Sequence, residues 1–270
     1  MQEMGPGPLY TRFFIKRVER VSPMLTQHTR VVTPTVSAYP PEFRDPRPIE
    51  DQIRSLSLIL RLVPYQALRY AKRLPSLDSF VPKTALSWAG WFAVPSTFAL
   101  AKWFPKAADP AMRYAMGVIL MNKTIAHVRR FFDYVGGSVA VNHFRLREDT
   151  ADALAKLEKQ QAGDILLIAA QLGMYHKGRS VRQSRLNFAG NEFGLGSLGV
   201  GSIILNHPEC MTRPGDLDMD CAGDECDRNE EGQFLHAPFF DFRESHVQFS
   251  SEDLDRALED YGSVTFFFPC

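Results

Sequence analysis

The sequence predicts a mainly α-helical protein. We expect an extended, proline-rich N-terminal arm, a basic helical region, and a smaller, acidic and mostly helical C-terminal domain. Eight prolines interrupt the first 50 residues, and proline removes a backbone donor and blocks helix formation. Apolar residues recur at helical spacing in two later stretches, which is typical of helices with one buried face. Charge is also divided unevenly along the chain.

This division of charge places a boundary near residue 147. Residues 1–147 carry 21 lysines and arginines against 9 aspartates and glutamates, whereas residues 148–270 carry 10 against 22. Such asymmetry indicates a basic half that faces an anionic surface, whether lipid, nucleic acid or an acidic protein. We therefore divide the chain into residues 1–50, a docking arm; residues 51–147, a basic region that contacts a membrane; and residues 148–270, an acidic domain.

The arm contains one amphipathic segment, residues 9–21 (LYTRFFIKRVERV). Its basic and aromatic residues resemble those of an organelle-targeting helix. A short surface helix that docks on a partner explains the same pattern, and both readings stay open. The N-terminus has no continuous apolar region of the kind found in secretory signals, so we do not expect secretion.

Helices are predicted over several stretches of the chain. Ile49 opens the first, which continues to Leu74 and is split at Pro64, because proline does not fit the interior of a helix. Pro110 precedes a second helix over 111–134, and a glycine pair follows it. Proline is common at the start of helices and glycine just after their end. Further helices are expected over the polar stretch 148–162, the apolar run 165–175 and the short stretch 250–261.

Residues 84–101 (TALSWAGWFAVPSTFALA) form the longest uncharged run, bounded by Lys83 and Lys102. Eighteen residues reach the lower edge of a membrane-spanning helix, about 17–25 residues. Pro95 would kink such a helix, and the serines dilute its hydrophobicity. The run is therefore a candidate membrane-associated helix, and a buried core helix or hairpin remains the alternative.

The stretch 215–227 (GDLDMDCAGDECD) brings six carboxylate side chains and two cysteines together within 13 residues. Asp216, Asp218 and Asp220 stand at the first, third and fifth positions of a calcium-binding loop, and Asp227 stands at the twelfth. Cys221 occupies the position that requires glycine, however, and Asp227 is shorter than the usual bidentate glutamate. The pattern is an incomplete match to a calcium loop.

The same region offers softer metal ligands. His207, Cys210, Cys221 and Cys226 supply one imidazole and three thiols, a set that tetrahedral zinc accepts. Their spacing lacks the close pair on both sides that zinc modules usually show. The simplest reading is a solvated acidic loop beside ordinary buried thiols, so we assign no metal, cofactor or catalytic residue.

Gly194, Gly196 and Gly199 match the Gly-x-Gly-x-x-Gly pattern of dinucleotide sites. The preceding residues are polar and no βαβ pattern surrounds the motif, so close helix packing is the preferred explanation. The chain also has no nucleophile-elbow, zinc-protease or phosphate-loop motif.

The predicted function is a non-catalytic accessory subunit of a large membrane-associated assembly. We expect a respiratory complex or ATP synthase of the mitochondrial inner membrane, with protein partners bound through the arm and with lipid contact. A metal-dependent enzyme centred on residues 207–227 is the first alternative. An RNA-associated assembly protein is the second, although no RNA-binding fold is recognisable and nucleic acid is not an expected partner.

Overall fold

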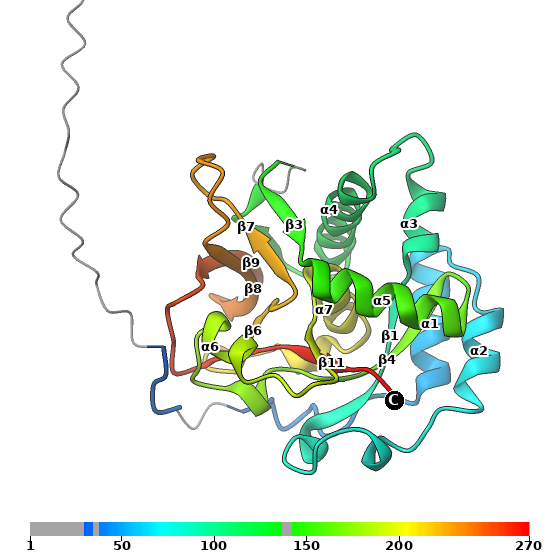
Figure 1. The fold of residues 1–270 in the computed structure, drawn as a ribbon, viewed down its shortest axis with the longest axis horizontal. Helices are drawn as coiled ribbons and strands as arrows, with labels where there is room; N and C mark the ends of the chain where they lie inside the picture. The colour runs from blue at the N-terminus through cyan, green and yellow to red at the C-terminus, as the bar shows by residue number, and fades with distance from the viewer. Residues whose placement is uncertain (1–29, 35–37, 137–141, 270) are drawn as a thin grey trace, which may run out of the picture.

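The computed structural model describes residues 30–34, 38–136 and 142–269, and it corrects the predicted fold class. The protein is a mixed α/β structure with a four-stranded and a seven-stranded sheet, not a mainly α protein (Figure 1). The helices are α1 (Ile49–Leu60), α2 (Tyr65–Ala71), α3 (Thr97–Trp103), α4 (Pro110–Val128), α5 (Glu148–Gln161), α6 (Val181–Leu186) and α7 (Ser197–Asn206).

The four-stranded sheet is antiparallel and has the order β1-β4-β11-β5. Its strands are β1 (Ala89–Pro95), β4 (Ile165–Gln171), β11 (Thr265–Phe267) and β5 (Glu192–Gly194). β1 pairs with β4 over its full length, from Ala89 opposite Gln171 to Pro95 opposite Ile165. Every residue of β4 is buried, so this strand lies at the centre of the protein core.

The seven-stranded sheet runs β10-β6-β8-β7-β3, with β9 beside β8 and β2 beside β9. Its strands are β10 (Tyr261–Ser263), β6 (Asp218–Asp220), β8 (His236–Arg243), β7 (Asp224–Cys226), β3 (Phe144–Leu146), β9 (His246–Asp253) and β2 (Phe131–Asp133). Helix α7 lies in the middle of the molecule (Figure 1), where it contacts α1, α4, β1 and β8. All ten of its residues are buried.

The candidate membrane helix 84–101 is wrong. This run forms a 3-10 turn, η2 (Leu86–Trp88), then strand β1 and then the start of helix α3. Trp91, Phe92 and Val94 favour a strand, and Pro95 ends it because proline cannot continue the hydrogen-bonded ladder. The Ser96 hydroxyl then accepts a hydrogen bond from the backbone N–H of Ala99 and caps α3. Within the described residues, no helix combines the length and the hydrophobicity that crossing a bilayer requires.

The acidic region 148–270 is also not mostly helical. The apolar run at 165–175, predicted as a buried helix, is strand β4, and the stretch predicted as a helix at 250–261 begins inside strand β9. A short apolar run bounded by turn residues fits a buried strand and a buried helix equally well. Most phenylalanines of the C-terminal tail belong to β8, β9 and β11.

Three helical predictions are confirmed: the helix split at Pro64, the helix that follows Pro110 and the polar helix from residue 148. α1 begins at Ile49 and α2 ends at Ala71, with a break that contains Pro64 and a left-handed residue, Arg61. α4 begins at Pro110 but ends at Val128, earlier than predicted. α5 spans 148–161 as expected.

The described part of the N-terminal arm packs on its own chain. Val32 donates its backbone N–H to the carbonyl of Gly178 at 2.8 Å, and Arg47 forms an ion pair with Glu209 at 2.7 Å. The docking arm 1–50 remains a prediction for its first part, because residues 1–29, including the amphipathic segment 9–21, lie outside the described residues.

Candidate functional site

The acidic stretch 215–227 is buried and highly connected, not a solvated loop. It forms β6, a turn and β7, and the exposed fractions of Asp218, Asp220 and Asp224 are 3%, 5% and 0%. Asp218 accepts a hydrogen bond from Arg243 at 2.9 Å. Asp227 accepts backbone N–H groups of the following turn, the shortest from Gly232 at 2.7 Å. These carboxylates therefore fix local structure.

The residues of the calcium pattern do not converge. Asp216 accepts the backbone N–H groups of Thr212 and Arg213, at 3.0 and 2.7 Å, while Asp218 and Asp227 bind the separate partners described above. Asp220 lies on β6, opposite Phe239 of β8. In the part of the chain that the structure describes, no group of three or more histidine, cysteine, aspartate or glutamate side chains is arranged to hold a metal ion.

The zinc set is likewise dispersed. His207 accepts the backbone N–H of Arg47 on Nε2 at 3.1 Å, and its Nδ1 lies 3.2 Å from the Ile203 carbonyl oxygen, so both ring nitrogens have protein partners. Burial lowers the pKa of His207 to about 4. Cys210, Cys221 and Cys226 are free and buried, and burial raises the pKa of Cys210 and of Cys226 to about 12. Thiols in such surroundings are unreactive.

The glycine motif does lie between a strand and a helix, β5 and α7, but its anion position is filled by the protein. The Asp224 carboxylate accepts the backbone N–H of Ser197 at 2.6 Å, at the first turn of α7, and the Tyr114 hydroxyl at 2.8 Å. A Cβ atom on Gly196 would lie 2.2 Å from the Tyr114 hydroxyl oxygen. Gly196 is therefore needed for close packing, and the helix N-terminus that would bind a phosphate is occupied.

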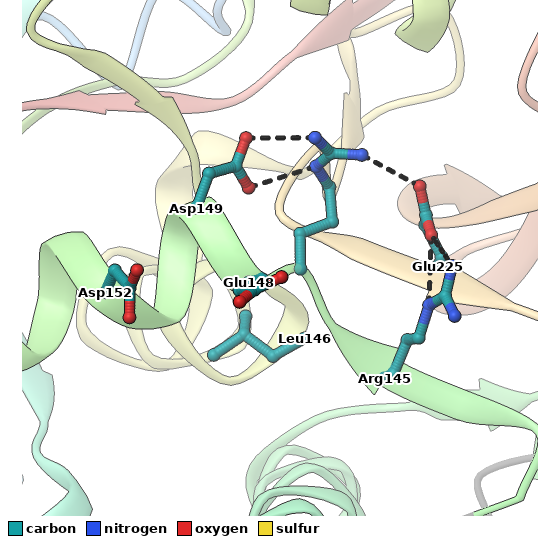
Figure 2. A pocket seen from close by; sticks show the side chains of 7 residues that line it. Arg145, Leu146, Glu148, Asp149, Asp152 and Glu225 are labelled. Carbon is teal, nitrogen blue, oxygen red and sulfur yellow. Dashed lines mark hydrogen bonds and ion pairs between the residues drawn. The ribbon is translucent and has the colours of Figure 1, made fainter.

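Glu225, the neighbour of Asp224, joins three arginines. Its Oε2 accepts hydrogen bonds from Arg145, the shorter at 2.6 Å, and its Oε1 accepts from Arg147 at 3.0 Å and from Arg185 at 2.8 Å. Burial alone would raise the pKa of Glu225, but hydrogen bonds and charges from these arginines lower it. Arg147 also donates two hydrogen bonds to Asp149. Figure 2 shows the part of this network that joins Arg145 and Glu225 to the start of α5 at Asp149.

This network forms one side of a surface concavity, which we call the charged recess. Its lining residues are Arg145, Leu146, Arg147, Glu148, Asp149, Asp152 and Glu225. Glu148 and Asp152 make no ion pair or side-chain hydrogen bond with another described residue. The recess thus presents both free carboxylates and the half-exposed guanidinium group of Arg145, whose side chain is 52% exposed.

A second concavity, which we call the apolar cavity, adjoins the recess at Arg145 and Leu146. It has a volume of about 490 Å³ and lies between α3, α4, β3 and α5. Its lining residues are Thr97, Phe98, Leu100, Ala101, Pro110, Ala111, Arg113, Tyr114, Arg145, Leu146, Ala151 and Leu154. A small inner space of about 30 Å³ continues toward Gly196 and Leu198. The recess and the apolar cavity together form one surface with an apolar and a charged part.

The apolar cavity has the chemistry of a binding site. Its two hydroxyl groups are both engaged, because Thr97 donates to Glu158 and Tyr114 donates to Asp224. Burial, followed by the charge of Asp224, raises the pKa of Tyr114 well above its usual value. Neither group is positioned to act as a nucleophile or a base, whereas the apolar walls can cover an apolar group.

Sequence reasoning did not find this site. The stretch 144–147 alternates apolar and basic residues, which is a strand signal, but it was assigned to the boundary between the two charge regions. The cavity also depends on α3, whose first residues, 97–101, lie in the run predicted as a membrane helix. Comparisons with known proteins add no function, since no family model, curated protein or solved structure matches the chain.

Proposed function

We propose that the protein is a non-catalytic accessory subunit that binds another protein subunit through the apolar cavity and the charged recess. The observation that carries the proposal is the apolar cavity itself, which lies open between three helices. Its volume falls within the range of about 300–1,000 Å³ that is usual for pockets that bind small molecules, so a side chain of a partner would also fit in it. In protein interfaces, a few apolar side chains inserted into such pockets supply most of the affinity.

The exposed surface beside the cavity supports a bound partner. Phe98, which lines the cavity on α3, is 49% exposed. Apolar area that a partner removes from water contributes about 25 cal/mol per Å² before the costs of association. Covering Phe98 and the cavity wall together therefore favours complex formation.

The charged recess favours a polypeptide partner over a simple anion or cation. It offers the Arg145 guanidinium group beside the unpaired carboxylates of Glu148 and Asp152. A partner segment that carries both signs of charge complements this rim, which would fix the register of binding more than its strength.

We place this assembly at the mitochondrial inner membrane, because the basic and aromatic segment 9–21 resembles an organelle-targeting helix. Contact with lipid would then be peripheral and would not involve residues 84–101. A tagged full-length protein that fractionates away from mitochondria would contradict this placement.

Neither alternative function gains support from the geometry. The metal-dependent enzyme centred on 207–227 would need convergent ligands, but the carboxylates and thiols of this stretch are buried against separate protein partners. The RNA-associated alternative would need a continuous basic or aromatic platform. Arg145 on β3 and Arg147 just after it instead pair with Glu225 and Asp149, respectively.

Site-specific photocrosslinking in cells of the source organism tests the proposal. Phe98 and Tyr65, two exposed aromatic residues of which only Phe98 lines the cavity, are replaced one at a time by p-benzoylphenylalanine. We expect a discrete crosslinked polypeptide from position 98 and none from position 65. Crosslinks from position 98 to lipid or small molecules only would overturn the proposal in favour of a small-ligand carrier.

A matched pair of cavity variants completes the test. Ala151→Trp places a large ring in the apolar cavity, whereas Ala155→Trp places it one turn further along α5 on the exposed surface. We expect Ala151→Trp to remove the crosslinked partner from the purified complex and Ala155→Trp to retain it. Equal recovery of the partner with both variants would show that the cavity is not the binding surface.

A further inference from the structure

A third concavity, separate from the apolar cavity and the recess, lies between residues 38–46 and the start of β1. It has a volume of about 380 Å³, and we call it the aromatic pocket. It shares no lining residue with the proposed partner-binding surface. Any ligand that it binds is therefore independent of the proposed function.

Two aromatic rings form a corner of this pocket. Tyr39 and Trp88 both line it, and their ring centroids lie 6.3 Å apart with an interplanar angle of 78°. The Trp88 residue remains 40% exposed, so part of the indole is accessible to a ligand. Near-perpendicular aromatic walls are the arrangement with which proteins bind alkylated ammonium groups, because ring faces attract a cation that sheds little hydration.

The walls of the pocket are fixed before a ligand binds. The Tyr39 hydroxyl accepts the backbone N–H of Leu172 at 3.1 Å. Phe43 packs edge-on against Tyr39 at 5.4 Å and against His207 at 5.8 Å. A preformed site avoids the cost of ordering its side chains when the ligand arrives, and this raises affinity.

The pocket also carries one charge of each sign. Arg44 and Asp45 both line it, and neither makes an ion pair with another residue in the part of the chain that the structure describes. A cation alone would be attracted by Asp45 and repelled by Arg44. A zwitterion would place its cation against Asp45 and the aromatic corner and its anion against Arg44.

We propose that the aromatic pocket binds a zwitterion in which a quaternary ammonium group is linked to an anionic group, as in phosphocholine. The trimethylammonium group lies in the corner of Tyr39 and Trp88, near Asp45, and the phosphate faces Arg44. The same chemistry occurs in a free metabolite and in a lipid headgroup. The experiment distinguishes these two sources.

The assignment is tested by titrating the full-length protein with phosphocholine and measuring binding by calorimetry and by tryptophan fluorescence. The decisive comparison is the isostere in which a tert-butyl group replaces trimethylammonium, because it has the same shape without the charge. We expect phosphocholine to bind at least about tenfold more tightly than the isostere. Equal affinity, or no saturable binding of phosphocholine at millimolar concentrations, would overturn the proposal.

Variants identify the groups responsible. Trp88→Leu should abolish binding while Trp88→Phe, which keeps an aromatic face, retains most of it. Asp45→Asn should weaken binding several-fold, whereas Asp78→Asn, at an exposed carboxylate outside the pocket, should leave it unchanged. If Trp88→Leu and Trp88→Phe bind phosphocholine equally, the aromatic corner is not the site.

Phosphatidylcholine vesicles, compared with vesicles in which phosphatidylglycerol replaces that lipid, separate the two sources. Cosedimentation with phosphatidylcholine that Trp88→Leu abolishes assigns a lipid headgroup. Binding of free phosphocholine without cosedimentation assigns a soluble zwitterion. Ala151→Trp should leave both readouts unchanged, which separates this pocket from the partner-binding surface.

Discussion

Asp220 is a carboxyl group enclosed by the protein, and its protonation links folding to pH. Burial raises its pKa to about 8; the nearby charge of Arg185 opposes this shift, and Glu252 and Asp260 add to it. Burial raises the pKa of Asp218 as well, but that carboxylate also accepts a hydrogen bond from Arg243. Asp220 is therefore the better position at which to test how a buried carboxyl group changes stability with pH.

We predict that the free energy of unfolding falls as pH rises from about 4 toward 8 because of Asp220. A carboxyl group whose folded pKa is raised contributes stability below its unfolded value, 3.8, and this contribution is lost as pH rises through the folded value. The loss approaches about 1.4 kcal/mol for each pH unit between the two values. Asp220→Asn, which stays neutral, should flatten the profile and stabilise the protein at pH 8.

Urea denaturation between pH 5 and pH 8 measures this difference. Asp78→Asn, an exposed carboxylate, is the control and should leave the shape of the pH profile unchanged. A profile of Asp220→Asn that runs parallel to that of the wild type would show that Asp220 is ionised in the folded protein at neutral pH.

At the residue level, the sequence indicates that the acidic stretch 215–227 is chemically unusual, but the prediction that it is exposed to solvent is wrong. A run of charges is usually a solvated surface, and nothing local in 215–227 indicates that Glu225 will meet Arg145 and Arg185. These arginines are 80 and 40 residues away in sequence. The stretch is buried because its side chains pair with residues distant in the sequence, and the periodicity of apolar residues gives no information about such pairs.

The same limit applies to whole elements. α1, α4 and α5 were predictable, because their amphipathic or polar patterns extend over three or more turns and are bounded by proline or charge. β1 and β4 were not, since each is a run of only seven residues, and their strand pairing and helix packing involve partners far away in the sequence. The apolar cavity is bounded by α3. The sequence does not predict α3 as a separate helix, because its first residues and β1 lie in one uncharged run.

The close contact of β5 with the turn between β6 and β7 can be tested by substitution of a glycine. A Cβ atom on Gly194 would lie 2.4 Å from the backbone carbon of Ala222, whereas a Cβ on Gly190 has nothing within 4 Å. We predict that Gly194→Ala destabilises the protein by about 1–3 kcal/mol, the usual cost of overpacking a rigid core. Gly190→Ala is the matched control and should change the free energy of unfolding by less than about 0.5 kcal/mol.

Chemical denaturation of both variants measures the two values. Equal stability of Gly194→Ala and Gly190→Ala would show that β5 moves away from the turn at little cost. The close packing inferred for the glycine motif would then be unsupported.

Across the whole molecule, the boundary of charge near residue 147 does not coincide with a boundary between sheets. β1 pairs with β4, β2 with β9 and β3 with β7, so that three strand pairs join the basic and acidic regions. The division of the chain into residues 51–147 and 148–270 is still a prediction about independent folding. The strand pairing weighs against it, because each fragment would expose the edges of strands that the other covers.

We predict that residues 148–270 alone do not fold. This fragment loses β1, which pairs with all seven residues of the buried strand β4, and α4, which packs against the fully buried helix α7. Exposing these elements removes apolar burial that offsets the entropy of ordering the chain. Expressed alone, the fragment should be insoluble or give a narrow amide region in its NMR spectrum. Coexpression with residues 1–147 should recover a soluble complex with dispersed resonances, whereas dispersed resonances from 148–270 alone would establish an independent acidic domain.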